Sequence, residues 1–276
     1  MLSMIAITYI GHATTLIEWD GSTLLTDPNF SSHIFFFKRH VPCHDDLTRL
    51  SPPECVLLSH THFDHLDIPS YKYLSCQIPL IVPKGVAPLI HRILPHPVIE
   101  LPHHSTWTSP RGLKITALYA RHLGGRYSGI RYTGCNSYLI EKEEQAIFFS
   151  GDTAYHSHFK KLGQEKTISA ALLPIGSYRP RWIMKYRHMD PQEALKACQD
   201  LQAQYMIPIH WGTFRFSTEP LEEPIHMLQS LLQEQPITTQ VKILSHGAKI
   251  TLENPFFIPA KDIASAPKLH LAHPAS

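Results

Sequence analysis

Four side chains that can bind a metal ion stand close together in the hexapeptide His60-Thr61-His62-Phe63-Asp64-His65. It follows Cys55-Val56-Leu57-Leu58, a short apolar run that predicts a strand buried on both faces. Proteins of alternating strands and helices commonly build their sites just past the carboxyl end of a strand. Helix packing does not explain the four residues, because they would point in different directions around any regular element. A compact loop can instead turn the first pair toward one ion and the second pair toward another; the alternative is a polar surface loop that happens to be rich in histidine.

The segments around this loop read as alternating strands and helices. The N-terminal third predicts strands at 5–10, 14–19 and 23–26, with the turn Asp20-Gly21 joining the last two. A loop from 28 to 53 comes next, and a short helix is expected from Ile68. Later strands are expected at 80–82, 114–120, 137–141, 146–150, 170–175 and 205–209, and a helix at 86–94. The clearest helix starts after Asp190, which can cap it, with Pro191 in the first turn and Glu193 completing a capping box.

Strands followed by helices, twice over, predict two sheets packed face to face with helices outside, although periodicity alone is equally compatible with other layered α/β arrangements. With 276 residues, the chain is long enough for one large domain. We expect that domain to span residues 1–255. The Pro- and Ala-rich stretch 256–276 is expected to be a loosely held tail.

Composition excludes several classes of protein. Charged residues make up 17% and hydrophobic ones 43%, which is typical of a globular protein and not of a disordered one. A formal charge of +2, without any run of four Lys or Arg residues, argues against a nucleic-acid partner. Five widely spaced cysteines with no CxxC pair or secretory signal favour a reducing compartment, so we expect a cytoplasmic protein. Apolar stretches fall well short of the ~20 residues that span a bilayer, which leaves peripheral contact with a membrane open.

The sequence resembles the metallo-β-lactamase superfamily, whose signature is HxHxDH after a strand. The remaining motifs of that superfamily occur in order along the chain: Asp27 in Leu24-Leu25-Thr26-Asp27-Pro28, His122 after the strand at 114–120, Asp152 in Gly151-Asp152-Thr153, and His210 after Met206-Ile207-Pro208-Ile209. Each lies just past a predicted strand, so one edge of the fold would collect them. The resemblance extends to about residue 225.

Within the superfamily, the sequence is similar to N-acylphosphatidylethanolamine-hydrolysing phospholipase D and its bacterial relatives. The stretches that carry this likeness are Tyr9-Ile10-Gly11-His12-Ala13-Thr14, Asp64-His65-Leu66-Asp67, Phe149-Ser150-Gly151-Asp152-Thr153, Pro180-Arg181-Trp182-Ile183-Met184-Lys185-Tyr186-Arg187-His188-Met189-Asp190-Pro191 and Ile209-His210-Trp211-Gly212-Thr213-Phe214. The last two discriminate far better than HxHxDH, which every branch shares.

The resemblance implies a four-layer αββα sandwich and a dinuclear zinc centre. His60, His62 and His122 would hold the first ion, Asp64, His65 and His210 the second, and Asp152 would bridge them. Imidazole nitrogen suits zinc, although iron or manganese in its place stays open. A water shared by the ions would have its pKa lowered toward ~7, and the resulting bridging hydroxide is the expected nucleophile.

Four further residues receive roles by the same resemblance. Asp27 and Asp67 are expected to accept hydrogen bonds from ligand imidazoles and so fix their tautomers, with a plain turn residue as the alternative for Asp27. His188 would donate a proton to the leaving group or bind substrate, with a simple surface histidine as the alternative. His12 belongs to a family motif and is either functional or structural.

The expected activity is hydrolysis of a phosphodiester, in a phospholipid such as N-acylphosphatidylethanolamine or a related compound. Alternatives are a carboxylic ester or lactone hydrolase with the same centre, a nuclease, and a non-catalytic protein whose metals only brace the fold. Two features bear on a small-molecule or lipid substrate. Cations at 179, 181, 185 and 187 alternate with aromatic residues and either face an anionic phosphate or form a solvated rim around Trp182 and Met184 in the core. The segment departs from the lipase pattern at Arg179 and Arg187. The segment Ile34-Phe35-Phe36-Phe37, followed by Lys38-Arg39-His40, either contacts an acyl chain or membrane or packs over a sheet. The oligomeric state is not indicated.

Overall fold

Two large sheets form the framework of the protein in the computed structural model, which describes residues 4–43, 51–126, 134–234 and 237–252. The first sheet has the order β16-β1-β2-β3-β6-β7-β8, with bounds Ala248–Leu252, Ile5–Gly11, Thr14–Trp19, Ser22–Thr26, Cys55–Leu57, Leu80–Pro83 and Val98–Leu101. The second has the order β15-β14-β13-β12-β11-β10-β9, with bounds Gln240–Val241, Tyr205–Ile209, Ile168–Pro174, Gln145–Phe149, Asn136–Lys142, Lys114–Tyr119 and Thr106–Thr108.

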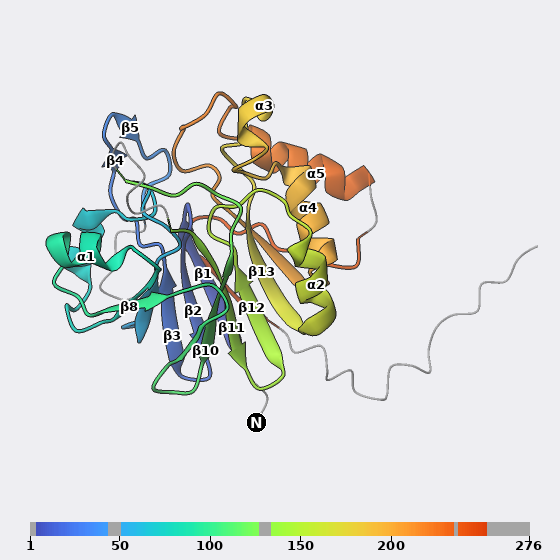
Figure 1. The fold of residues 1–276 in the computed structure, drawn as a ribbon. Helices are drawn as coiled ribbons and strands as arrows, with labels where there is room; N and C mark the ends of the chain where they lie inside the picture. The colour runs from blue at the N-terminus through green and yellow to red at the C-terminus, as the bar shows by residue number, and fades with distance from the viewer. Residues whose placement is uncertain (1–3, 44–50, 127–133, 235–236, 253–276) are drawn as a thin grey trace, which may run out of the picture.

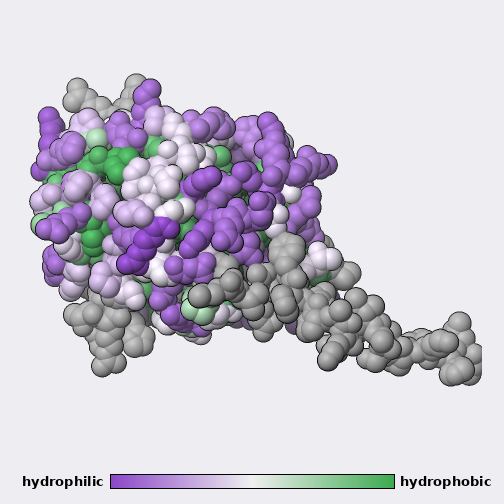
Figure 2. All heavy atoms as spheres, turned by 90° about the horizontal axis from the view of Figure 1, so that it is seen from below, coloured by the Kyte–Doolittle hydropathy of each residue, from purple (hydrophilic) through white to green (hydrophobic). Residues whose placement is uncertain are grey.

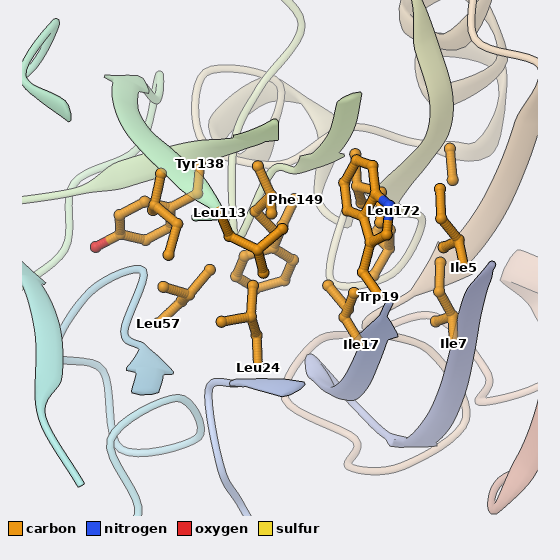
Figure 3. Packing of buried hydrophobic residues seen from close by; sticks show 14 of the residues in the cluster. Ile5, Ile7, Ile17, Trp19, Leu24, Leu57, Leu113, Tyr138, Phe149 and Leu172 are labelled. Atoms are coloured by element: carbon orange, nitrogen blue, oxygen red, sulfur yellow. The ribbon is translucent and has the colours of Figure 1, made fainter. Parts of the chain in front are cut away.

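The sheets pack against each other through the inward-facing side chains of their strands (Figure 3). Alternation along each strand selects these residues. On β2, Ile17 and Trp19 enter the core between the sheets, whereas Leu16 joins a separate cluster on the outer face. On β13, Leu172 faces inward and Leu173 faces the helices. Strands covered on both faces in this way explain the nearly continuous apolar runs in the sequence.

Helices cover the outer face of each sheet (Figure 1). The second sheet is covered by α2 (His158–Glu165), α4 (Pro191–Asp200) and α5 (Glu223–Glu234), whose apolar residues share a cluster with the outer side of that sheet. The first sheet is covered by α1 (Ala87–Ile93) and by η2 (Ile68–Tyr73), a 3-10 helix. The arrangement is an αββα sandwich, as the sequence predicted.

The hairpin turn and the helix cap that the sequence predicted are both present. Asp20 and Gly21 both have positive φ, at 45° and 81°, which is the geometry of a tight hairpin turn between β2 and β3. Asp190 caps α4 because its carboxylate accepts the backbone N–H of Glu193 at 2.9 Å. Glu193 pairs with Arg181 at 2.9 Å and does not complete a capping box.

The segment expected to be a loop from 28 to 53 contains a short hairpin within its described part. It consists of β4 (His33–Ile34) and β5 (Phe37–Lys38). At its tip, Phe35 and Phe36 have 67% and 83% of their surface exposed, so the aromatic run does not pack over a sheet. Residues 44–50 of this segment, and the expected tail at 256–276, lie outside the described residues.

The carboxyl ends of β1, β3, β6, β10, β12, β13 and β14 meet at one end of the sandwich, because these strands run in the same direction. The β4–β5 hairpin and α3 (Arg181–Met184) stand at this end (Figure 1). The opposite end is mostly hydrophilic, with apolar surface only in small patches (Figure 2). Phe36, at the tip of the β4–β5 hairpin, and Trp182, in α3, are exposed aromatic side chains at the end where these strands finish.

Candidate metal centre

The seven ligands that the sequence predicted come together in loops at this end of the sandwich. Those loops follow β6, β10, β12 and β14 and carry His60, His62, Asp64, His65, His122, Asp152 and His210. Their side chains form two main groups, and in each group the ligand atoms lie within 4.8 Å of one another: His60, His62 and His122 with Asp152, and Asp64, His65 and His210 with His12. A third group of the same kind joins Asp152 and His210 to His188. Residues from distant parts of the chain meet here because parallel strands end at the same edge.

The first group is formed by His60, His62, His122 and Asp152. Nδ1 of His62 lies 2.9 Å from Nε2 of His60 and 3.2 Å from Nε2 of His122. Oδ2 of Asp152 lies 3.8 Å from the His60 nitrogen and 3.9 Å from the His122 nitrogen. Two nitrogens bound to one tetrahedral zinc ion are ~3.4 Å apart, given Zn–N distances of about 2.0–2.1 Å. The spacing of these atoms therefore suits a shared cation.

The second group contains Asp64, His65, His210 and His12, and Asp152 lies beside it. Oδ2 of Asp64 lies 3.5 Å from Nε2 of His65 and 3.4 Å from Nε2 of His210. Asp152 reaches the same two nitrogens, with Oδ2 at 3.2 Å from His65 and Oδ1 at 3.4 Å from His210. Asp152 thus faces both groups, which is the position that a bridging carboxylate needs.

Several of these polar atoms are buried without a hydrogen-bond partner. They include Nε2 of His65, both ring nitrogens of His210, Oδ1 of Asp152 and Nδ1 of His188. A buried polar atom without a partner costs roughly 1–3 kcal/mol, so a cluster of them calls for an explanation. A bound cation gives one, because imidazole nitrogen and carboxylate oxygen are the donors that zinc and related ions prefer. The residues present therefore fit a metal ion.

The charges of the site support the same conclusion. Asp27 and Asp152 are buried and Asp64 is partly buried, and within the described part of the chain the ion-pair partners of all three are histidines. Although burial opposes a charge on His65, the carboxylates of Asp152, Asp64 and Asp27 raise its pKa well above the usual value. Burial lowers the pKa of His122 to about 4, so its ring is neutral at neutral pH and its nitrogen is available to a metal. The neighbouring histidines hold the pKa of the Asp64 and Asp152 carboxyls well below the usual value although burial opposes their charge, and a bound cation would stabilise the same two carboxylates.

Asp27 and Ser59 fix the tautomers of two ligand imidazoles. Oδ2 of Asp27 lies 2.7 Å from Nδ1 of His65, which turns Nε2 of that ring toward the metal site. The hydroxyl of Ser59 donates to the same carboxylate at 2.5 Å and lies 2.9 Å from Nδ1 of His60, from which it can accept. The expected contact of Asp27 with an imidazole is thus present. Through its hydrogen bond with Ser59, Asp27 also influences the tautomer of His60. Sequence reasoning missed Ser59, whose only signal is its place directly before the ligand loop.

His122 and His188 lie side by side at the other edge of the centre. Nδ1 of His122 donates to the backbone oxygen of Arg187 at 2.9 Å, which leaves its Nε2 for the first group. The rings of His122 and His188 make an edge contact at 4.9 Å. His188 is 7% exposed, and its Nδ1 lies 3.9 Å from Oδ2 of Asp152. His188 therefore faces the centre and is not a surface histidine.

His12 contacts the second group through both its side chain and its backbone. Its Nε2 lies 2.9 Å from Oδ2 of Asp64, and its ring centroid lies 4.0 Å from that of His210. Its carbonyl oxygen accepts the backbone N–H of His210 at 2.7 Å, and its own N–H donates to Thr213 at 3.0 Å. A left-handed φ of 57° at this non-glycine residue is held by these contacts. His12 thus joins the turn after β1 to two ligands of the centre.

The role expected for Asp67 needs correction. Its Oδ2 accepts hydrogen bonds from the hydroxyls of Ser31, at 2.6 Å, and of Ser70, and no described imidazole is among its hydrogen-bond partners. Asp67 stands at the start of η2, which directs its side chain toward Ser70 in the first turn and away from the ligand rings. It anchors the loop to the helix and does not fix a tautomer.

Comparisons with known proteins agree with this geometry. Residues 22–211 match the family model described as a β-lactamase superfamily domain. An N-acyl-phosphatidylethanolamine-hydrolysing phospholipase D of Caenorhabditis elegans is 30% identical over 82% of this chain and 69% of its own length. The mitochondrial enzyme of that name from Saccharomyces cerevisiae is 33% identical over 82% of this chain, which spans about half, 51%, of the yeast protein. A solved metallo hydrolase from Ignicoccus hospitalis superposes with a TM-score of 0.68 at 20% identity, covering 91% of this chain and 99% of its own.

The chain belongs to the metallo-β-lactamase superfamily and is a metal-dependent hydrolase of that class. The fold and the placement of the candidate ligands at one end of the two sheets agree with this assignment. Among the described helices, none is both long and apolar enough to span a membrane.

Proposed function

We propose that this protein uses two metal ions to hydrolyse a phosphodiester of a phospholipid, such as N-acylphosphatidylethanolamine. The observation that carries the proposal is the pair of ligand groups that share Asp152. Relatives named for hydrolysis of this lipid, at 30–33% identity, supply the substrate class. Zinc is the ion we propose, because five of the seven ligands are imidazoles, and iron or manganese are the alternatives.

The bound ions would supply a water activated to hydroxide at neutral pH and a Lewis acid for the phosphoryl oxygen. The residues of the chain set the geometry for this chemistry. Asp152 holds the two groups together, while Asp27 and Ser59 orient the rings of His65 and His60. We assign His188 to contact with the substrate, because its buried Nδ1 faces the centre and has no hydrogen-bond partner.

A lipid substrate also agrees with the apolar surface near the centre. The ring of Phe35 packs at 4.5 Å against Phe63, which lies within the ligand loop, while Phe36 extends outward with 83% of its surface exposed. An aromatic hairpin tip next to a catalytic loop is suited to peripheral contact with a lipid surface or an acyl chain. This contact is part of the proposal.

The substitution Asp152→Asn tests the proposal directly. It keeps the size of the side chain but removes the charge that faces both groups, so hydrolysis of N-acylphosphatidylethanolamine should fall by at least ~10³-fold while the circular dichroism spectrum stays unchanged. The released N-acylethanolamine is measured by mass spectrometry. A folded, metal-loaded Asp152→Asn protein with wild-type turnover would refute the role of this residue.

A panel of three substrates, compared by their kcat/KM values, tests the substrate class. It contains N-acylphosphatidylethanolamine in vesicles, the water-soluble bis(p-nitrophenyl) phosphate, and simple lactones. The proposal predicts the highest value for the lipid. A preference for lactones would assign the centre to acyl-ester chemistry, and equal values for the lipid and the soluble phosphodiester would count against a lipid substrate.

A further inference from the structure

Two of the four cations around α3 are neutralised by neighbouring carboxylates. Arg179 forms an ion pair with Glu223 at 2.6 Å. Arg181 forms ion pairs with Asp190 at 3.3 Å and Glu193 at 2.9 Å, which tie α3 to the start of α4. The charges of these two arginines are therefore balanced by carboxylates of the protein itself.

The other two cations of this segment, Lys185 and Arg187, are exposed and form no ion pair with the described residues. Arg121 likewise has no described carboxylate partner: its guanidinium donates to the backbone oxygen of Tyr155 at 3.3 Å. Arg121 and Lys185 both lie over the ring of Tyr186, at 5.5 Å and 5.0 Å from its centroid. We call Arg121, Lys185 and Arg187 the cationic rim.

The cationic rim borders the first ligand group. Arg121 directly precedes His122 in the chain, and the backbone oxygen of Arg187 accepts the hydrogen bond from Nδ1 of His122. Arg187 also precedes His188, whose Nδ1 lies 3.9 Å from Asp152. The candidate ligands are buried or partly buried, whereas Lys185 and Arg187 are exposed. A substrate that reaches both must extend from the metal centre outward past His122.

We propose that the cationic rim binds a second anionic group of the substrate, next to the phosphodiester that is cleaved. The inference rests on the proposed function and specifies its substrate class: a phosphodiester whose headgroup carries a carboxylate or similar anion. The metal ions that the centre would hold would balance the charge of the phosphodiester itself. The rim adds positive charges outside it that no described carboxylate neutralises, and a guanidinium matches a carboxylate through two parallel hydrogen bonds.

Two lipids that differ by one carboxylate test the inference. N-acylphosphatidylserine and N-acylphosphatidylethanolamine are presented to the holoenzyme in neutral detergent micelles, so that surface charge does not contribute. The wild-type kcat/KM should favour the serine lipid by roughly two- to fivefold, the size expected for exposed charge pairs, and the preference should shrink as salt is raised. In the double variant Lys185→Gln/Arg187→Gln, the ratio should fall to about one.

Arg179→Gln is the matched control. It removes a guanidinium from the same segment, but one that Glu223 already neutralises, so the ratio between the two lipids should stay at the wild-type value. The inference is overturned, with the proposed function intact, when the wild-type protein cleaves both lipids equally well or when the double variant keeps the wild-type ratio.

If the proposed function is wrong, neither lipid is cleaved. The inference is then decided by binding, through titration of tryptophan fluorescence with dihexanoylphosphatidylserine and dihexanoylphosphatidylethanolamine. Tighter binding of the serine lipid by the wild-type protein, lost in the double variant, supports the cationic rim as a site for the carboxylate. Equal affinity for the two lipids contradicts it.

Discussion

Oxygen atoms of the protein set the direction of three ligand imidazoles. The second nitrogen of His60 faces the Ser59 hydroxyl, that of His65 faces Asp27, and that of His122 faces a backbone carbonyl. A histidine that donates from one nitrogen must offer the lone pair of the other, so these contacts preset the ligand atoms. Contacts within the protein thus support the orientation of these three rings.

Ser59 allows this control to be tested. Ser59→Ala removes the acceptor for Nδ1 of His60 and one hydrogen bond to Asp27, so metal affinity should fall by about 10–100-fold, the range typical of such supporting contacts. Competition with a fluorescent chelator measures the affinity. Ser31→Ala is the control, since Ser31 also donates to a carboxylate, that of Asp67, but no imidazole depends on it. Equal affinities in the two variants would rule out the role given to Ser59.

At the residue scale, the sequence predicted the seven candidate ligands but not all of their supports. Histidine and aspartate just past predicted strands are visible in a sequence because their chemistry is distinctive. Ser59 is not, because a serine at a strand end has many uses. Asp67 was misassigned because its role came from the family resemblance, whereas the start of η2 directs its side chain to Ser31 and Ser70.

At the scale of elements, the loops after β6 and β12 approach each other closely. Gly151 adopts a left-handed φ of 57°, and a Cβ at this position would collide with the side chain of Ser59. Because Gly151 has no side chain, the loop that carries Asp152 can pack closely against the loop that follows β6. Tight packing between two loops of different sheets therefore contributes to the geometry of the centre.

Gly151→Ala and Gly112→Ala separate backbone strain from this close approach. Both glycines have positive φ, but a Cβ at Gly112 would meet no atom within 4 Å. Gly112→Ala should cost about 1–2 kcal/mol of unfolding free energy from the backbone alone. Gly151→Ala should cost roughly 2–5 kcal/mol, because overpacking adds to the strain, and should also weaken metal binding. Urea denaturation measures both; equal losses would show that the close approach is unimportant.

Long apolar strands and the capped helix α4 could be predicted from the sequence, whereas short or edge elements could not. The β4–β5 hairpin has only two residues in each strand, too few to show a period. β16 pairs with β1 although some 240 residues separate them, and its half-exposed pattern gives a weak signal. Pairing over such a distance depends on the assembled sheet and leaves little trace in the local sequence.

At the scale of the whole molecule, the C-terminal part of the described chain contacts segments that carry the metal centre. His246, in the turn before β16, lies 2.9 Å from the Thr213 hydroxyl, and its ring packs at 5.1 Å from Tyr9. Thr213 in turn accepts the N–H of His12. These contacts join the turn before β16 to the turn after β1 and to the segment after His210.

Burial, together with the nearby charge of Arg39, lowers the pKa of His246 to about 4. An unfolded chain binds this proton near pH 6.5, so the group favours folding above that pH, and its contribution is lost as pH falls from 6.5 toward 4. The melting temperature of the chelated protein should therefore drop between pH 7 and 4.5. His246→Gln cannot titrate and should show a smaller drop; an equal drop would exclude this histidine as a cause.

The central claim is that two cations occupy the two ligand groups that share Asp152. Metal content per chain, measured by mass spectrometry after chelation and titration with zinc, tests it most directly. The structure predicts that two equivalents bind to the wild-type protein and that His60→Ala and His65→Ala each bind fewer. A wild-type chain that takes up no zinc, iron or manganese, or variants that bind as much metal as the wild type, would contradict it.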